Sequence, residues 1–212
     1  MQQCTKRVLQ FRKIFYKFVG SLRHHYDTRN IMNNKIEYVL VDLDGTLIET
    51  DLANNMAYKE AIEVCAYEKE VFIDVNGPRI TRADITKIYG ENEKAENIIR
   101  TKESIFYKYL PLTSLITSTM ALLLQYRNSN KKLILVTNCK SRRAVELLEY
   151  YDIDSMFYAQ FYNDCGNKYT KVLTEYNISP QNAMLIENEE SQIMNAVVAG
   201  VAAKNIIKVK AN

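Results

Sequence analysis

The chain has 212 residues, of which 47% are hydrophobic and 25% are charged, the balance of a folded globular protein rather than a disordered one. This length suits one domain, or one domain that carries an insertion. The formal net charge is +3, but residues 1–31 hold seven of the 28 Lys and Arg residues and only one acid. The rest of the chain is therefore mildly acidic, and we expect no nucleic-acid-binding surface on it.

The four cysteines, at positions 4, 65, 139 and 165, are widely spaced and include no CxxC pair. This spacing predicts neither a zinc site nor a disulfide framework, and it favours reduced thiols in a cytoplasmic protein. The sequence contains no stretch of 18 apolar residues, so we expect no membrane-spanning helix. The N-terminus is also unlike a secretory signal, because Arg12, Lys13 and Lys17 interrupt its apolar residues.

Residues 1–31 form a basic N-terminal extension in which residues 5–23 have the spacing of an amphipathic helix. Three interpretations are open. The helix could lie on a membrane surface, which is the least favoured of the three, or dock on this protein or a partner. The extension could also lie outside the working protein, because Met32 directly precedes the point where a compact domain would begin.

From residue 36 onward the pattern predicts strands that alternate with helices. Five short apolar segments are predicted strands: residues 36–43, 131–138, 155–162, 183–188 and 205–210. Three segments between the later strands are predicted helices: residues 142–153, 168–178 and 190–201. This alternation is typical of βαβ units around a parallel sheet.

Residues 50–118 break the alternation. They contain three helical patterns, at 54–72, 81–90 and 95–110, and no strong strand. We therefore predict a helical insertion directly after the first strand.

Polar residues follow the predicted strands where each strand ends. They are Asp42 and Asp44 after the first strand, Thr137 and Asn138 after the second, Lys168 at the start of a helix, and Glu187, Asn188, Glu189 and Glu190 after the fourth. Ligands of an open parallel sheet bind at the carboxyl ends of its strands, so we expect these side chains to converge at one edge.

Asp42 and Asp44 pose an electrostatic problem, because two carboxylates so close together repel and are costly to desolvate. A divalent cation would remove the repulsion, and Mg²⁺ prefers hard oxygen ligands beside a substrate phosphate. A carboxylate can also act as the nucleophile that accepts a phosphoryl group. Gly45 lets the chain turn sharply and exposes backbone N–H groups to an anion.

These segments resemble the four motifs of the haloacid dehalogenase superfamily, in the branch of beta-phosphoglucomutase and phosphoglycolate phosphatase. DLDGT at 42–46 resembles the first motif, VTN at 136–138 the second and Lys168 the third. LIENEES at 185–191, with AGV at 199–201, resembles the acidic fourth motif. The resemblance covers about residues 36–210.

The resemblance implies an α/β fold, with a Rossmann-like three-layer parallel sheet core and an inserted α-helical cap. The core would comprise residues 32–49 and 119–212, and the cap residues 50–118. It also implies Mg²⁺ held by the Asp42 carboxylate, the Asp44 backbone carbonyl and the fourth motif, where Glu187 and Asn188 are the candidates.

The roles of the other residues follow from the same resemblance. Asp42 would attack the phosphorus atom, and Asp44 would protonate the leaving oxygen and then activate water. Thr137 would bind a phosphoryl oxygen, and Lys168, which we favour over Lys171, would neutralise the developing charge.

The substrate would be contacted from both parts of the chain. Gly45, Thr46 and Asn138 are the core candidates. Arg79 and Lys102 of the cap could hold a second anionic group of the substrate.

The fourth motif departs from the family pattern. Relatives in this branch usually carry a pair of acids, whereas here Asn188 follows Glu187 and Gln192 stands four residues later. An amide oxygen can bind Mg²⁺ without contributing charge, so we expect a weaker metal site.

The leading hypothesis is a Mg²⁺-dependent phosphatase that hydrolyses a small phosphorylated metabolite through an aspartyl-phosphate. The alternatives are a phosphomutase that uses the same chemistry, and a catalytically weakened or inactive domain that serves as a binding or regulatory module. The sequence does not predict the oligomeric state.

Overall fold

The computed structural model describes residues 35–65, 73–163 and 165–209. The predicted N-terminal extension, residues 1–31, lies outside the described residues, so its three interpretations stay predictions. In the described part of the chain, no helix is both long and apolar enough to cross a membrane.

The centre of the fold is a five-stranded parallel sheet in the order β5-β4-β1-β6-β7. The strands are β1 (Tyr38–Val41), β4 (Lys132–Thr137), β5 (Ala159–Tyr162), β6 (Ala183–Glu187) and β7 (Ile206–Lys208). Leu40 of β1 lies opposite Ile134 on one side and Leu185 on the other. The α/β prediction is thereby confirmed. Strand β5 is shorter than expected, because a 3₁₀ turn, η2 (Asp154–Met156), takes the start of the predicted segment.

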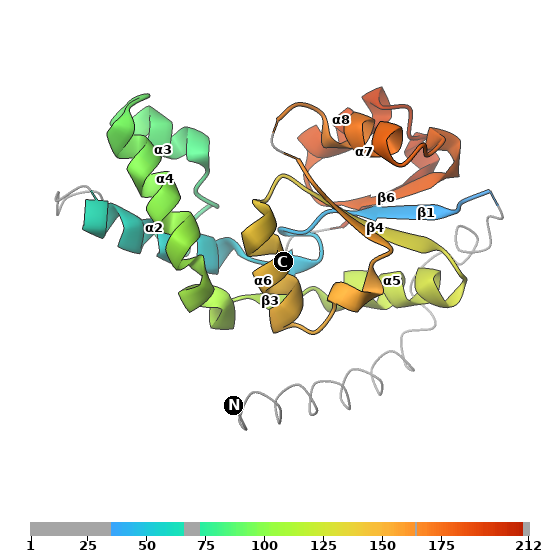
Figure 1. Ribbon diagram of the computed structural model, residues 1–212, viewed down its shortest axis with the longest axis horizontal. Coiled ribbons are helices and arrows are strands. Elements are labelled where there is room, and N and C mark those ends of the chain that lie inside the picture. The colour runs from blue at the N-terminus through green and yellow to red at the C-terminus, as the bar shows by residue number, and fades with distance from the viewer. Residues whose placement is uncertain (1–34, 66–72, 164, 210–212) are drawn as a thin grey trace, which may run out of the picture.

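Two layers of helices cover the sheet (Figure 1). On one face lie α7 (Lys168–Glu175) and α8 (Glu190–Val198), and on the other α5 (Thr117–Asn128) and α6 (Ser141–Tyr150). The side chains of β1 alternate between the two layers as a strand requires. Val39 and Val41 pack in the cluster that contains the helix α6 residue Leu147, whereas Leu40 packs in the cluster that contains Val172 of α7. Short 3₁₀ turns, η3 (Pro180–Asn182) and η4 (Ala203–Asn205), precede β6 and β7.

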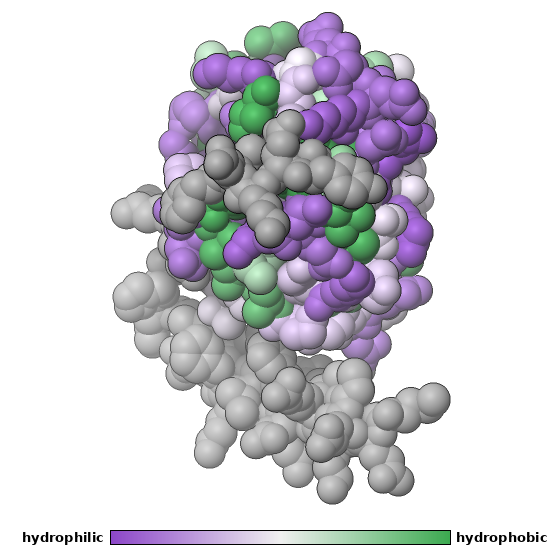
Figure 2. Space-filling view, turned by 90° about the vertical axis from the view of Figure 1, so that its left-hand side faces the viewer, coloured by the Kyte–Doolittle hydropathy of each residue, from purple (hydrophilic) through white to green (hydrophobic). Residues whose placement is uncertain are grey.

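A helical lobe lies between β1 and α5, where residues 50–118 were predicted to form a cap, and we call this lobe the cap (Figure 1). It consists of β2 (Ile48–Glu49), α2 (Asp51–Cys65), α3 (Arg82–Tyr89), α4 (Glu93–Ile105), η1 (Phe106–Leu112) and β3 (Ser114–Leu115). It has a hydrophobic core of its own, which includes Tyr58, Ile85 and Ile98. Hydrophilic side chains make up much of its coloured outer face (Figure 2), although several apolar side chains of the cap, among them Val64 and Ile88, are exposed.

Strands β2 and β3 and helix α5 were not predicted. Strands β2 and β3 pair antiparallel, Ile48 with Leu115, where the chain enters and leaves the cap. Two residues are too few to show a strand period, so no sequence pattern could indicate them. Helix α5 was missed because its apolar residues are contiguous around MALLL instead of following a helical period, and the fold buries them on several sides.

Asn55 of α2 fixes the segment that leads into α3. Its Oδ1 accepts a hydrogen bond from the Ile80 N–H at 2.9 Å, and its Nδ2 lies 3.2 Å from the Pro78 carbonyl oxygen. The neighbouring Asn54 donates from Nδ2 to the Ile80 carbonyl oxygen at 2.8 Å. Both asparagines are buried, so these amides set the position of Arg79, which lies between the two residues they bind.

We expect Asn55→Ala to destabilise the cap, because it leaves the Ile80 N–H and the carbonyl groups that Asn55 binds without their partner. The free energy of unfolding should fall by about 2 kcal/mol, measured by urea denaturation. The matched control is Asn128→Ala, an exposed position at the end of α5, which should change stability by less than about 0.5 kcal/mol. Equal effects of the two substitutions would contradict this account.

Candidate active site

Lys168 joins two carboxylates at the carboxyl edge of the sheet. Its Nζ donates to Asp42 Oδ1 at 2.6 Å and to Glu187 Oε2 at 3.1 Å. Asp42 follows β1, Glu187 ends β6 and Lys168 begins α7, and all three side chains are buried. The rival, Lys171, instead reaches the exposed carbonyl oxygen of Cys165 at 2.8 Å. The structure therefore brings Lys168, and not Lys171, to the two acids.

The buried triad contains one cation and two carboxylates. Burial raises the pKa of Asp42 to about 7; Lys168 opposes this shift and Glu187 adds to it. Burial would lower the pKa of Lys168, but Asp42 and Glu187 outweigh burial and raise it. Lys168 is thus held as a cation, whereas Asp42 would be ionised more readily beside a second positive charge.

Glu187 is held by four donors. Its Oε1 accepts the backbone N–H groups of Asn188 at 2.9 Å and Glu189 at 3.1 Å. Its Oε2 accepts from Lys168 and from the Tyr169 hydroxyl at 2.5 Å. Burial, and next the Glu187 charge, raises the pKa of Tyr169 well above its ordinary value. Tyr169 was not predicted as a site residue, and its position next to Lys168 was the only signal in the sequence.

Hydrogen bonds between Thr46 and Asn188 link the first and fourth motifs. Thr46 Oγ1 donates to Asn188 Oδ1 at 2.9 Å and accepts from the Asn188 backbone N–H at 3.1 Å. Gly45 has φ +72°, and a Cβ there would lie 2.6 Å from Asn188 Nδ2, so a side chain at this position would be both strained and obstructed. The hydroxyl of Thr46, a predicted substrate contact, is engaged by Asn188.

The predicted metal ligands supply oxygen donors of the kind that Mg²⁺ prefers. Asp42, Glu187 and Asn188 lie around the same strand ends, linked by the Lys168 and Thr46 hydrogen bonds. However, the described residues contain no group of three or more His, Cys, Asp or Glu side chains that could hold a metal ion. The residues thus fit Mg²⁺ in donor type but carry little negative charge, because Asn188 is neutral and Glu187 is shared with Lys168.

Thr137 and Asn138 lie at the end of β4, as expected. The buried Thr137 Oγ1 accepts from the Cys139 backbone N–H at 3.0 Å, which leaves its hydroxyl hydrogen able to donate to a ligand. Asn138 Oδ1 accepts from Asn163 Nδ2 at 2.9 Å. The same Nδ2 donates to the Gly166 carbonyl oxygen at 3.0 Å, so Asn163 links the end of β4 to the loop before α7.

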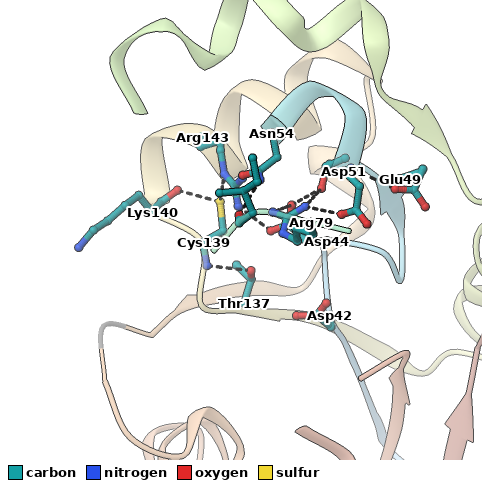
Figure 3. Close-up of polar contacts among 12 residues, drawn as sticks. Asp42, Asp44, Glu49, Asp51, Asn54, Arg79, Thr137, Cys139, Lys140 and Arg143 are labelled. Atoms are coloured by element: carbon teal, nitrogen blue, oxygen red, sulfur yellow. Dashed lines mark hydrogen bonds and ion pairs between the residues drawn. The ribbon is translucent and has the colours of Figure 1, made fainter. Parts of the chain in front are cut away.

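Asp44 is held by two arginines, from the cap and from α6 (Figure 3). Its Oδ2 accepts from Arg143 Nη2 at 2.6 Å, and its Oδ1 accepts from Arg79 Nη2 at 3.1 Å and from Thr50 Oγ1 at 2.5 Å. Burial would raise the pKa of Asp44, but Arg143 and Arg79 outweigh burial and hold it well below its usual range. The Asp42 carboxylate lies apart from this cluster (Figure 3).

Arg143 was not predicted as a site residue. It lies in the first turn of α6, six residues after Thr137, so its only signal was a basic pair directly after the second motif. Arg143 Nε also donates to Cys139 Sγ at 2.8 Å, and burial raises the pKa of that thiol to about 11. Arg143 is 5% exposed, and its Nη1 has no hydrogen-bond partner among the described residues.

Lys102 of α4 is a buried cation with few partners. It is 2% exposed, and its Nζ lies 3.4 Å from Glu103 Oε1. The ammonium also lies over the rings of Tyr58 and Phe106, at 5.1 and 5.2 Å from their centroids. Burial, and next the charge of Arg143, lowers the pKa of Lys102 to about 7.

Comparisons with known proteins agree with this geometry. The family model described as haloacid dehalogenase-like hydrolase matches residues 39–206. No curated protein sequence matches the chain.

Solved structures with the same fold cover most of the chain, at identities that support the fold alone. CbbY from Rhodobacter sphaeroides, in complex with phosphate, is 18% identical, with a TM-score of 0.68 over 82% of this chain and 86% of that one. A candidate beta-phosphoglucomutase from Thermotoga maritima is 20% identical, with a TM-score of 0.61 over 82% and 85%. A HAD-superfamily hydrolase, subfamily IA, from Geobacter sulfurreducens is 18% identical, with a TM-score of 0.61 over 83% and 88%.

We expect Lys102→Met to stabilise the protein at pH 7. The pKa of Lys102 is lower in the folded chain than in the unfolded chain, so the unfolded chain binds the proton that the folded chain releases. Stability should therefore rise between pH 7 and about pH 10 in the wild type. Lys102→Met should abolish this slope and add on the order of 3 kcal/mol at pH 7.

The measurement is urea denaturation at several pH values, and the matched control is Lys87→Met at an exposed position on α3. The control should keep the wild-type slope. A pH slope of Lys102→Met that equals that of the wild type would contradict the argument.

Proposed function

The chain belongs to the haloacid dehalogenase-like hydrolase family, and from that premise we propose that it is a Mg²⁺-dependent phosphatase of a small phosphorylated metabolite. The observation that carries the proposal is the buried Lys168, which bridges Asp42 and Glu187 at the carboxyl edge of the sheet. A buried lysine between two acids costs desolvation energy, which an anionic transition state beside it would offset.

In the proposed first step, an Asp42 carboxylate oxygen attacks the phosphorus atom of the ester. The bond between phosphorus and the leaving oxygen breaks, and that oxygen takes a proton from Asp44, which must first leave the two arginines that hold it ionised and become protonated. Lys168 neutralises charge on the phosphoryl oxygens, and the Thr137 hydroxyl donates to one of them. The products of this step are the free alcohol and an aspartyl-phosphate on Asp42.

In the second step, water attacks the phosphorus atom of the aspartyl-phosphate. Asp44, now a carboxylate, takes a proton from the water, and the bond between phosphorus and the Asp42 oxygen breaks. Inorganic phosphate leaves, and both aspartates return to their starting states. Other backbone N–H groups of this turn are further candidates to hold the phosphoryl group, whereas the Gly45 N–H donates to the Ile48 carbonyl oxygen at 2.8 Å.

Asp42, the Asp44 backbone carbonyl, Glu187 and Asn188 would hold Mg²⁺. The ion would supply positive charge to the phosphoryl oxygens and lower the pKa of Asp42. Other residues of the chain orient these ligands: Lys168 and Tyr169 orient Glu187, and Thr46 orients Asn188.

A small phosphorylated substrate is supported by one of the structural neighbours. CbbY from Rhodobacter sphaeroides is known in complexes with phosphate and with xylulose-(1,5)bisphosphate. In this chain, the predicted cap residues Arg79 and Lys102 lie on the side of the cap that reaches Asp44 and Arg143, where a substrate group beyond the phosphate would be bound.

Asn188 favours a second candidate, a phosphate-binding or regulatory module with little turnover. The neutral side chain at this position lowers the negative charge available for Mg²⁺. The two functions differ in whether Asp42 forms a covalent phosphoryl intermediate.

We expect Asp42→Asn to lower kcat by roughly a thousandfold or more, because it removes the nucleophile. The measurement is release of p-nitrophenol from p-nitrophenyl phosphate with Mg²⁺ present, and the matched control is Asp154→Asn in the exposed η2 turn. Wild-type turnover that survives in Asp42→Asn, or the absence of turnover with every phosphate ester tried, would overturn the phosphatase.

Asn188→Asp should strengthen Mg²⁺ binding by at least about tenfold, because it adds a negative charge while its oxygen can still accept from Thr46. Titration of Mg²⁺ by calorimetry measures the change, and Asn195→Asp on α8 is the control for added charge alone. If the Mg²⁺ affinity of Asn188→Asp were unchanged, the metal would bind away from residue 188, and this prediction would be wrong.

A further inference from the structure

The buried side chain of Tyr169 combines a ring that packs in the core with a hydroxyl that reaches the site. Tyr169 lies in the first turn of α7, and its ring packs in the cluster that contains Leu40 of β1 and Val172 of α7. The side chain is 0% exposed, and its hydroxyl donates to Glu187 Oε2 at 2.5 Å. A phenylalanine ring would fill the same space, so packing in the core does not require the hydroxyl.

Tyr169 and Lys168 donate to the same oxygen of Glu187. The Oε2 atom accepts from the Tyr169 hydroxyl and, at 3.1 Å, from Lys168 Nζ. Each oxygen of an ionised carboxylate offers about two lone pairs, so these two donors share the lone pairs of Oε2. The hydroxyl thus takes an acceptor position on Glu187 that would otherwise be open to the ammonium group.

The ammonium group lies closer to Asp42 than to Glu187. Lys168 Nζ is 2.6 Å from Asp42 Oδ1 and 3.1 Å from Glu187 Oε2, although both acids carry the same charge when ionised. The hydroxyl hydrogen bond stabilises the negative charge on Oε2 and weakens the attraction of Glu187 for the ammonium group.

The ring of Tyr169 also contacts the ammonium group. Lys168 Nζ lies 5.0 Å from the centroid of the Tyr169 ring, which is within the range of a cation–π contact. This contact holds the ammonium group on the side of the ring without competing with Asp42 for a hydrogen. Both parts of Tyr169 therefore act on the position of Lys168 Nζ.

We propose that Tyr169 is a positioning residue that keeps the Lys168 ammonium group on Asp42, because its hydroxyl occupies the Glu187 oxygen that would otherwise draw the ammonium group away. The proposal rests on the proposed function, in which Lys168 neutralises charge on the phosphoryl group that Asp42 attacks. Tyr169 itself does not contact the substrate in this scheme, and it acts through Glu187 and Lys168.

The position of the ammonium group matters most in the transition state. Negative charge develops on the phosphoryl oxygens beside Asp42, and the attraction of a buried cation for that charge falls with distance. Without the hydroxyl, Glu187 Oε2 would have a free acceptor position, and the ammonium group would shift toward it. Binding of the transition state should then weaken more than binding of a ground-state phosphate.

The test compares the wild-type full chain with Tyr169→Phe, which keeps the ring and removes only the hydroxyl. Orthovanadate mimics the transition state because it can take a fifth oxygen ligand from Asp42, whereas inorganic phosphate stays tetrahedral. Their binding is measured with Mg²⁺ present by vanadium and phosphorus NMR. We expect Tyr169→Phe to raise the Kd of vanadate by about tenfold or more and that of phosphate by about twofold or less.

Two further variants separate positioning from a structural effect. The matched control is Tyr126→Phe, which also removes a buried hydroxyl, one that has no hydrogen-bond partner among the described residues, and it should leave both Kd values unchanged. In a Glu187→Gln background, Tyr169→Phe should raise the Kd of vanadate by about threefold or less, because the hydroxyl acts through Glu187. Fully additive effects of the two substitutions would contradict the proposed route.

Thermal unfolding of each variant shows whether it is folded. If Tyr169→Phe does not fold, 3-fluorotyrosine placed at position 169 decides, because its hydroxyl is a stronger donor and should tighten vanadate binding by about twofold. Unchanged vanadate binding without the hydroxyl, or with the fluorinated ring where that variant decides, would overturn the proposal. An equal loss of vanadate and phosphate binding in Tyr169→Phe would overturn it too.

Turnover of p-nitrophenyl phosphate is measured in parallel, and in Tyr169→Phe kcat and kcat/KM should fall by the same factor of about ten or more. If vanadate binding responds to the hydroxyl but the wild type turns over no phosphate ester, the phosphatase is contradicted and the positioning role stands. If the wild type turns over substrate and Tyr169→Phe matches it, the positioning role is contradicted and the phosphatase stands. A wild type that neither binds vanadate nor turns over substrate would overturn both.

Discussion

The site depends on one buried cation, Lys168. Its ammonium group joins the ends of β1 and β6 through Asp42 and Glu187, and it brings the start of α7 to the same point. Three segments that are far apart in the sequence are thereby held at one edge of the sheet. Without Lys168, two buried carboxylates would face each other with no charge to compensate them, which would be unfavourable in the protein without a bound cation.

A second set of contacts relies on Asn188, at a position where the resemblance predicts an acid. Thr46 both donates to Asn188 and accepts from its backbone N–H, and Gly45 leaves room for the amide. The geometry of this corner thus does not need a charge at position 188. A change from an amide to a carboxylate at position 188 could therefore alter metal affinity without altering stability. The hydrogen bonds that hold the turn would form with either group.

The sequence predicted the elements whose patterns are local. The five strands were recognisable because each is a short apolar run, and Asp42, Thr137, Lys168 and Glu187 were recognisable because motif residues stand at strand ends. The Asp44–Arg143 pair was not predictable, because it joins residues 99 positions apart and depends on how α6 packs beside the first loop.

The other omissions have the same origin. Tyr169 was not predicted as a site residue, and only the folded structure shows that its hydroxyl reaches Glu187. Strands β2 and β3 are too short to leave a pattern, and α5 is buried on too many sides to show a polar face. In each case, the missing information was the three-dimensional proximity of distant segments.

The pairing of β2 with β3 has a consequence for how this protein could change over evolutionary time. Because Ile48 lies opposite Leu115, the two ends of the cap meet at one point, next to the sheet but outside it. Closing a loop whose ends already meet depends only weakly on its length. The cap could therefore be lengthened, shortened or replaced without disturbing the register between β1 and β4, so that new substrates could be acquired while the edge that holds Lys168 stays the same.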